Sequence, residues 1–164
     1  MAERDEHLVV LMLEPMPDGE EFEVWPMHIT IVPWFPCDDE DRLNETLAKV
    51  TQKHRAFEVK AGKIEEWGGR ERFKVLKIED DGALYRLHRD IFKNLEKNGF
   101  PIHQKEYMGE KYAPHVTLRN SLADKTRYKP GQSIKINKFT LVQQVRLRGS
   151  GRMIKSLVRD YELG

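Results

Sequence analysis

Residues 25–35 of this 164-residue chain read WPMHITIVPWF, and they predict a strand with two unusual positions. His28 and Thr30 alternate there with Ile29 and Ile31. Side chains at i and i+2 of a strand point to the same face, so the histidine and the threonine share one face and the isoleucines share the other. A strand buried on both faces would normally carry aliphatic residues at all four positions. The pattern therefore indicates one buried face and one face that offers an imidazole and a hydroxyl.

The same pattern recurs in the second half of the chain, where residues 114–119 read PHVTLR. His115 and Thr117 share one face of this predicted strand, opposite Val116 and Leu118. Two such pairs among six histidines and six threonines arise by chance on the order of 2% of the time. Each histidine alone could be a buried residue that is hydrogen-bonded to its neighbour, but that explanation does not predict the repetition.

Two imidazoles can serve as an acid–base couple, because histidine titrates near neutral pH and can take or give a proton on either side of a reacting centre. Threonine hydroxyls can donate hydrogen bonds to anionic oxygens, which suits a phosphodiester attacked in line. Arg119 has the same parity as His115 and Thr117, and its guanidinium could add charge stabilisation. The alternative for Arg119 is a solvent-exposed residue at the end of the strand.

The remaining pattern predicts an α+β chain in which antiparallel pairing dominates, because several connections are short enough to be hairpins. Two amphipathic segments predict helices, one capped by Asp38 or Asp39 and the other by Asp80 or Asp81, with Gly99 as the stop of the second. The predicted strands are 7–14, 27–33, 56–67, 72–79, 114–119 and a long closing hairpin of 133–147 with 153–163, and the predicted helices are 39–54 and 83–98.

Composition narrows the class of protein. No apolar run approaches the roughly 20 residues that span a bilayer, and the polar N-terminus lacks a signal-peptide core, so we expect a cytoplasmic protein without a membrane partner. Cys37 is the single cysteine, which excludes an internal disulfide and a cysteine-based metal cage.

The net charge is only +1, but acidic and basic residues are unevenly distributed along the chain. Residues 1–23 hold eight acids and one base, whereas residues 120–160 hold ten bases and two acids, which could bind a polyanion or simply solvate a sheet edge.

With its two H-x-T-aliphatic motifs, one per half, and the proline before the second, the chain resembles the two-histidine (2H) phosphoesterase superfamily. The segments HITIVPWF and YAPHVTLR are similar to the motif strands of its 2′-5′ RNA ligase-like branch. The resemblance covers essentially the whole chain. It implies a single domain over residues 1–164 with two pseudo-symmetric lobes, antiparallel sheets that form a central cleft, and helices on the outside.

The resemblance also implies a metal-free enzyme without a cofactor. It would hydrolyse, or reversibly form, phosphodiesters that involve a 2′ oxygen, commonly the 2′,3′-cyclic phosphates of nucleotides or RNA ends. The implied catalytic residues are His28, Thr30, His115 and Thr117. The candidate substrate-binding residues are Arg119, Trp34 and Tyr112. Because Pro33 can bend the strand, the face on which Trp34 lies is left open by the sequence.

Two other classes of function remain open. The first is an RNA-binding protein with little turnover, in which Trp25, Trp34, Trp67 and Tyr112 stack bases beside the basic C-terminal segment. The second is a phosphodiesterase of a small nucleotide such as ADP-ribose cyclic phosphate. A two-metal hydrolase is disfavoured, because the H-x-T motifs lack the carboxylates and further histidines of such sites. We expect a monomer.

Overall fold

The computed structural model describes residues 6–14, 16, 19–23, 25–103, 105–118, 128–147 and 149–164. Its strands are β1 (Glu6–Met12), β2 (Glu21–Phe22), β3 (His28–Pro36), β4 (Phe57–Trp67), β5 (Phe73–Glu79), β6 (His115–Leu118), β7 (Ser133–Ile136), β8 (Lys138–Arg146) and β9 (Met153–Glu162). Its helices are α1 (Glu40–Thr51) and α2 (Ala83–Lys97), with two short 3₁₀ turns, η1 (Lys105–Tyr107) and η2 (Gly109–Lys111).

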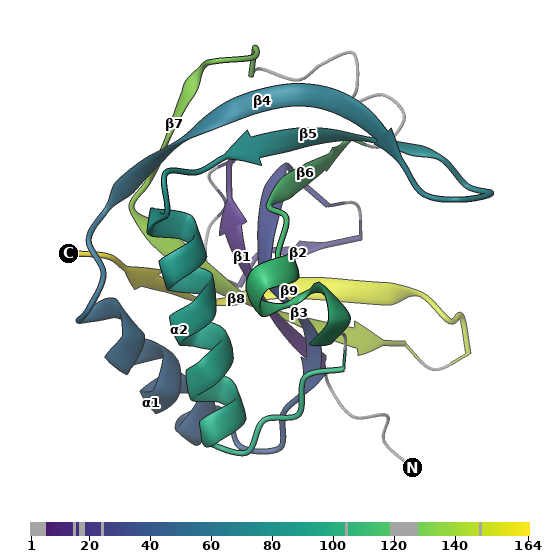
Figure 1. Cartoon of the computed structure of the whole chain (residues 1–164). Helices are drawn as coiled ribbons and strands as arrows, with labels where there is room; N and C mark the ends of the chain where they lie inside the picture. Colours follow the sequence, from purple (N-terminus) through teal and green to yellow (C-terminus); the bar gives the residue numbers. More distant parts are fainter. Residues whose placement is uncertain are drawn as a thin grey trace.

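The strands form one sheet of mainly antiparallel pairs in the order β2-β9-β8-β1-β3-β6-β5-β4-β7. The two motif strands, β3 and β6, are neighbours at its middle, with β1, β8 and β9 on one side and β5, β4 and β7 on the other. Figure 1 shows β4 and β5 arching above the other strands. The predicted α+β class is confirmed, and the sheets of the two halves join edge to edge where β3 meets β6.

Both helices cover one face of the sheet and lie side by side (Figure 1). Asp39 caps α1, since its carboxylate accepts a hydrogen bond from the Arg42 amide at 3.0 Å. The N-cap of α2 is Gly82 rather than the predicted Asp80 or Asp81, but the Asp80 carboxylate still accepts from the Leu84 and Tyr85 amides at 3.0 and 2.9 Å. Each amphipathic helix buries one apolar face, and the buried residues include Leu43, Leu47, Val50, Leu84, Leu87, Ile91 and Leu95. They belong to the main core, between the sheet and the helices.

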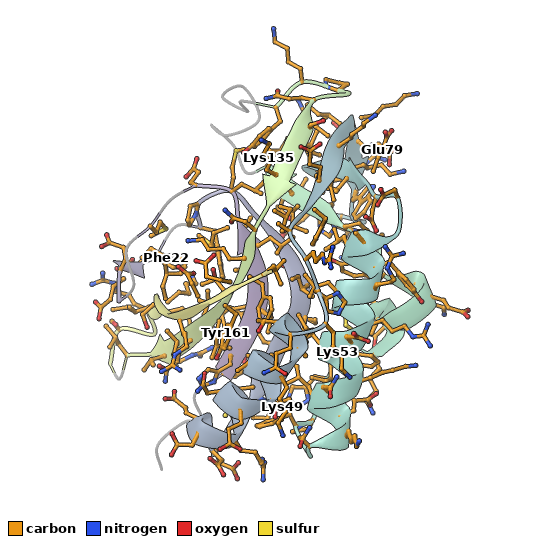
Figure 2. All side chains as sticks on the ribbon, turned by 90° about the vertical axis from the view of Figure 1, so that its left-hand side faces the viewer. Phe22, Lys49, Lys53, Glu79, Lys135 and Tyr161 are labelled. Carbon is orange, nitrogen blue, oxygen red and sulfur yellow. The ribbon has the colours of Figure 1, made fainter. Side chains whose placement is uncertain are left out.

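A second, smaller cluster lies on the opposite face of the sheet, which we call the open face. Its buried members are Leu8, Val10, Val142 and Leu157. Aromatic residues pack against it, among them Phe22, Trp25 and Trp34. In Figure 2, Phe22 lies on the far side of the sheet from α1. The labelled Lys49 belongs to α1, and Lys53 lies just beyond the end of that helix. Strand alternation explains the two clusters, because Leu8 and Val10 point to the open face while Val9 and Leu11 enter the main core.

The predicted closing hairpin is wrong in its first arm. Residues 133–147 form two strands, of which β7 pairs with β4 and β8 pairs with β1 and β9. The buried positions change parity at this break, from Ile134 and Ile136 to Phe139 and Leu141. A continuous strand cannot bury both sets on one face, so the chain changes partner at Asn137.

The short strand β2 was not predicted. Its two residues pair with Ser156 and Lys155 of β9. Nearby, the Lys155 ammonium donates to the Glu23 carbonyl at 2.8 Å, and Arg152 forms an ion pair with Glu23. One acid of the N-terminal segment, Glu23, is therefore paired with a base that directly precedes the last strand.

Candidate active site

The site is built on the pairing of β3 with β6, in which Ile29 lies opposite Val116. The antiparallel register around this pair sets His28 opposite Thr117 and Thr30 opposite His115. The four side chains therefore form a square, with the histidines on one diagonal and the threonines on the other. Diagonal neighbours in such a pair lie about 7–8 Å apart. This spacing places both imidazoles beside one point on the sheet, above the Ile29–Val116 pair.

Burial shows which face carries the square. Ile29 and Val116 are fully buried in the main core, whereas the histidines and threonines are only half-buried. They therefore lie on the open face, as the alternation of the two motifs predicts. Within the part of the chain that the structure describes, the hydroxyls of Thr30 and Thr117 make no hydrogen bond. Both hydroxyls can thus donate to a ligand.

Both histidines are held by the same local contact. The Nδ1 atom of His28 lies 2.9 Å from the Pro26 carbonyl oxygen, and that of His115 lies 2.9 Å from the Ala113 carbonyl oxygen. A carbonyl oxygen only accepts, so Nδ1 must carry the proton in each ring. The lone pair of each neutral imidazole is then on Nε2, which becomes the nitrogen that exchanges protons. Sequence reasoning did not foresee these two backbone contacts.

A tryptophan lies beside each imidazole. The ring centroids of Trp25 and His28 are 4.1 Å apart, and those of Trp67 and His115 are 4.7 Å apart. Trp25 precedes β3 and Trp67 ends β4, so distant segments supply equivalent walls to the two halves of the site. The sequence marked both tryptophans as candidates for base stacking, but it did not indicate that each would flank a motif histidine.

Trp34 lies on the open face, with its ring centroid 6.1 Å from that of Trp25. Val32 shares the parity of Thr30 and Trp34, yet it is buried in the main core. The register between β1 and β3 shifts at this point, which marks a bulge. Because of this irregularity, Val32 faces the main core, whereas Trp34 again faces the open side with Thr30. Trp34, the predicted base-stacking residue, therefore lies on the same face as the histidines. Trp25 lies between Trp34 and His28, with its ring near both.

Tyr112, which lies just before β6, contacts the backbone of β3. Its hydroxyl donates to the Thr30 carbonyl at 2.7 Å, and its ring stacks on His88 with centroids 3.9 Å apart. Burial raises the pKa of the Tyr112 phenol far above its ordinary value, so the hydroxyl stays a donor. Tyr112 was predicted to bind substrate, whereas the hydroxyl it carries is engaged by the backbone of β3.

His88 completes this connection. It is fully buried on α2, where its Nδ1 lies 2.9 Å from the Ile31 carbonyl and its Nε2 accepts from the Gly109 amide at 3.1 Å. These two partners require a neutral ring that is protonated on Nδ1. Burial lowers the pKa of His88, which agrees with the neutral form. His88 is thus a packing residue, and it links α2 and η2 to β3.

Three further features that the sequence raised concern Arg119, a metal site and a membrane span. Arg119, the predicted cation of the site, lies outside the described residues. Among the described residues, no group of three or more histidine, cysteine, aspartate or glutamate side chains is placed to hold a metal ion. No helix in the same part of the chain is long and apolar enough to span a membrane.

The arrangement can support acid–base chemistry at one phosphorus centre. The two imidazoles occupy opposite corners of the square, and the two threonine hydroxyls occupy the remaining corners. One imidazole can accept a proton while the other donates one, and the hydroxyls can donate to non-bridging oxygens.

Comparison with solved structures identifies proteins of the same fold. Structures similar to this chain include one titled a phosphoesterase (TM-score 0.63, 14% identity, covering 98% of this chain and 99% of the other). They also include E. coli LigT complexed with 3′-AMP (TM-score 0.63, 16% identity, 98% and 99%) and the protein TT0787 of Thermus thermophilus (TM-score 0.62, 18% identity, 96% and 97%). At these identities the likeness establishes the fold.

No match was found among the curated proteins. The family profile described as the 2′-5′ RNA ligase superfamily matches residues 13–145, which is most of the chain and includes both histidine motifs. The chain therefore belongs to the 2′-5′ RNA ligase superfamily of 2H phosphoesterases.

Proposed function

We propose that this protein is a metal-independent phosphodiesterase that hydrolyses 2′,3′-cyclic phosphates of ribonucleotides or RNA ends. The observation that carries the proposal is the diagonal placement of His28 and His115 across the β3–β6 pair, with Nδ1 of each ring bound to a backbone carbonyl. In this proposal, the Nε2 nitrogens of the two histidines exchange protons on either side of one phosphate. Membership of the superfamily supports an enzyme of the phosphoesterase or RNA ligase-like type.

In the proposed reaction, the cyclic phosphate binds above the Ile29–Val116 pair. One histidine removes a proton from the attacking water, a new P–O bond forms, and the bond to one ribose oxygen breaks. The other histidine protonates that departing oxygen. Thr30 and Thr117 donate to the non-bridging oxygens as their charge grows. When a 5′-hydroxyl replaces water, the same groups form a 2′-5′ linkage without ATP, and the reverse reaction cleaves it.

The direct test replaces each histidine with alanine. His28→Ala and His115→Ala should each lower turnover of a 2′,3′-cyclic nucleotide by about 10²- to 10⁴-fold, the usual contribution of a general acid or base. The matched control is His103→Ala, because His103 is an exposed histidine outside both motifs. The wild-type rate should survive a strong chelator and give a bell-shaped pH profile. Loss of activity with the chelator, or full activity in either motif variant, would contradict the proposal.

A panel of substrates then narrows the class. Turnover should be compared on a 2′,3′-cyclic mononucleotide, an oligonucleotide with a cyclic phosphate end, and ADP-ribose cyclic phosphate. The aromatic residues near His28 favour a substrate with a nucleobase. Salt-dependent RNA binding without turnover of any member would instead identify an RNA-binding protein. We expect the active species to be a monomer, which sedimentation can check.

A further inference from the structure

Strand β4 changes face as it approaches the site. Val59 and Ala61 are buried in the main core, and an unbroken alternation would place Glu65 on the same side. The register with β5 shifts between Ala61 and Ile64, so that two residues of β4 lie opposite Lys77 alone. Such a bulge reverses the alternation and bends the strand, in keeping with the arch of β4 in Figure 1. Glu65 therefore faces the open side.

The pairing of β4, β5 and β6 shows how close this residue is to the site. Glu65 lies opposite Val75, and Val75 lies opposite Thr117 of the square. Lys77, two residues further along β5, lies opposite His115. Side chains that lie directly opposite each other share a face of the sheet. Glu65 and Lys77 are therefore on the open face, next to the His115 corner of the square.

The Glu65 carboxylate has a partner for each of its oxygens. Its Oε2 accepts a hydrogen bond from the Trp67 indole Nε1 at 3.1 Å, and its Oε1 lies 3.6 Å from the Lys77 ammonium. The hydrogen bond from Trp67 is the main reason that the pKa of Glu65 falls below its ordinary value, and the charge of Lys77 adds to the effect. The carboxylate is therefore ionised at neutral pH and holds both partners.

Trp67 in turn lies against a motif imidazole. The ring centroids of Trp67 and His115 are 4.7 Å apart, and the rings are tilted by 56°. The contact of Nδ1 with the Ala113 carbonyl fixes one atom of the imidazole, and the indole limits how far the ring can turn about that contact. Together the two contacts set the direction in which Nε2 points.

The indole depends on this hydrogen bond because the end of the hairpin gives it little packing. Trp67 ends β4, and its cross-strand partner Phe73 is 39% exposed. Trp25, the equivalent ring on the other side of the site, packs edge-on against Phe22 with 4.9 Å between the centroids. One half of the site thus holds its tryptophan by aromatic packing, and the other half holds it by a carboxylate.

We propose that Glu65 is a positioning residue for His115, because its carboxylate holds the Trp67 indole against the imidazole. This inference rests on the proposed function and adds to it a residue outside both motifs. A proton transfer requires Nε2 to be aligned with the reacting oxygen, so a ring that turns freely spends less time in the productive geometry. Loss of the hold should therefore lower kcat more than it raises KM.

Three variants test this role with a 2′,3′-cyclic nucleotide as substrate. Glu65→Ala removes the acceptor of the indole, and its kcat should fall about 3- to 10-fold, the rate equivalent of one intramolecular hydrogen bond. Glu65→Gln keeps an acceptor oxygen for the indole but gives up the charge that pairs with Lys77, so it should recover most of the rate. The matched control is Glu66→Ala, which should keep the wild-type rate, because Glu66 is the next residue, is also exposed and faces the opposite side of β4.

A measurement without substrate reports on the positioning directly. The ring current of Trp67 should displace the NMR resonance of the His115 Cε1 proton, which is assigned by its absence from His115→Ala. In Glu65→Ala the resonance should move toward its position in Trp67→Leu, where the indole is gone. Glu65→Gln and Glu66→Ala should keep the wild-type position.

Two results would overturn the positioning role: a wild-type resonance in Glu65→Ala, or a kcat in Glu65→Gln as low as that of Glu65→Ala. Absence of turnover in the wild-type protein would instead contradict the proposed function. The resonance would still decide whether Glu65 holds the indole, because that comparison needs no substrate.

Discussion

The hydrogen bond from Tyr112 to Thr30 predicts a measurable link between stability and activity. In Tyr112→Phe, the ring can still stack on His88, but the donor 2.7 Å from the Thr30 carbonyl is lost. A typical intramolecular hydrogen bond contributes about 0.5–1.5 kcal/mol net, and a buried carbonyl left without a partner costs about 1–3 kcal/mol. Because the backbone of β3 can relax, we expect the free energy of unfolding to fall by about 1–2 kcal/mol.

The same substitution should affect catalysis, because the carbonyl belongs to a motif threonine and Tyr112 lies three residues before His115. In the proposed mechanism, Thr30 donates to an oxygen whose charge grows in the transition state. A displacement of Thr30 should therefore lower kcat several-fold while KM changes little. Urea unfolding and steady-state kinetics on a 2′,3′-cyclic nucleotide measure the two effects.

The control for this experiment is Tyr107→Phe. Tyr107 is 61% exposed in η1, and its hydroxyl has no hydrogen-bond partner among the described residues. Its removal should change the free energy of unfolding by no more than a few tenths of a kcal/mol. If Tyr112→Phe unfolded at the same urea concentration as the control, the reasoning that assigns this bond a role in holding β3 would be refuted.

Three further predictions concern stability. Burial lowers the folded-state pKa of His88, so the unfolded chain binds more protons and the free energy of unfolding should fall as the pH drops below about 6.5. His88→Gln keeps a donor and an acceptor, so its free energy of unfolding in urea should decline less between pH 7 and pH 5. An equal decline in the two proteins would contradict this reasoning. Gly68→Ala should lower the unfolding free energy by about 1–3 kcal/mol, because its φ of +100° and the 2.5 Å approach to a carbonyl oxygen strain any Cβ; a neutral result would refute the turn geometry. Asp39→Ala should cost about 1 kcal/mol in thermal or urea unfolding through loss of the α1 cap, whereas Asp41→Ala, two residues later, should cost less.

Local signals in the sequence were sufficient for most elements. The helix faces, the aspartate cap of α1 and the stop at Gly99 follow from periodicity and from backbone chemistry that involves only a few neighbouring residues. The strands around the motifs follow from alternation. The sequence did not predict strand β2 or the separation of β7 from β8, because the pairing of a short strand depends on a partner far along the chain. The change of parity between Ile136 and Phe139 was the available signal for the second case.

The sequence by itself determined that two imidazole–hydroxyl pairs would each stand on one face of a strand, because the two-residue repeat of a strand is a local property. Only the tertiary structure decided that these strands are neighbours, with His28 diagonal to His115, because strand order depends on how the whole sheet buries its apolar faces. The tertiary structure also decided that Trp25 and Trp67 flank the histidines and that Tyr112 holds β3. Those contacts join residues from distant segments, so no local pattern could specify them.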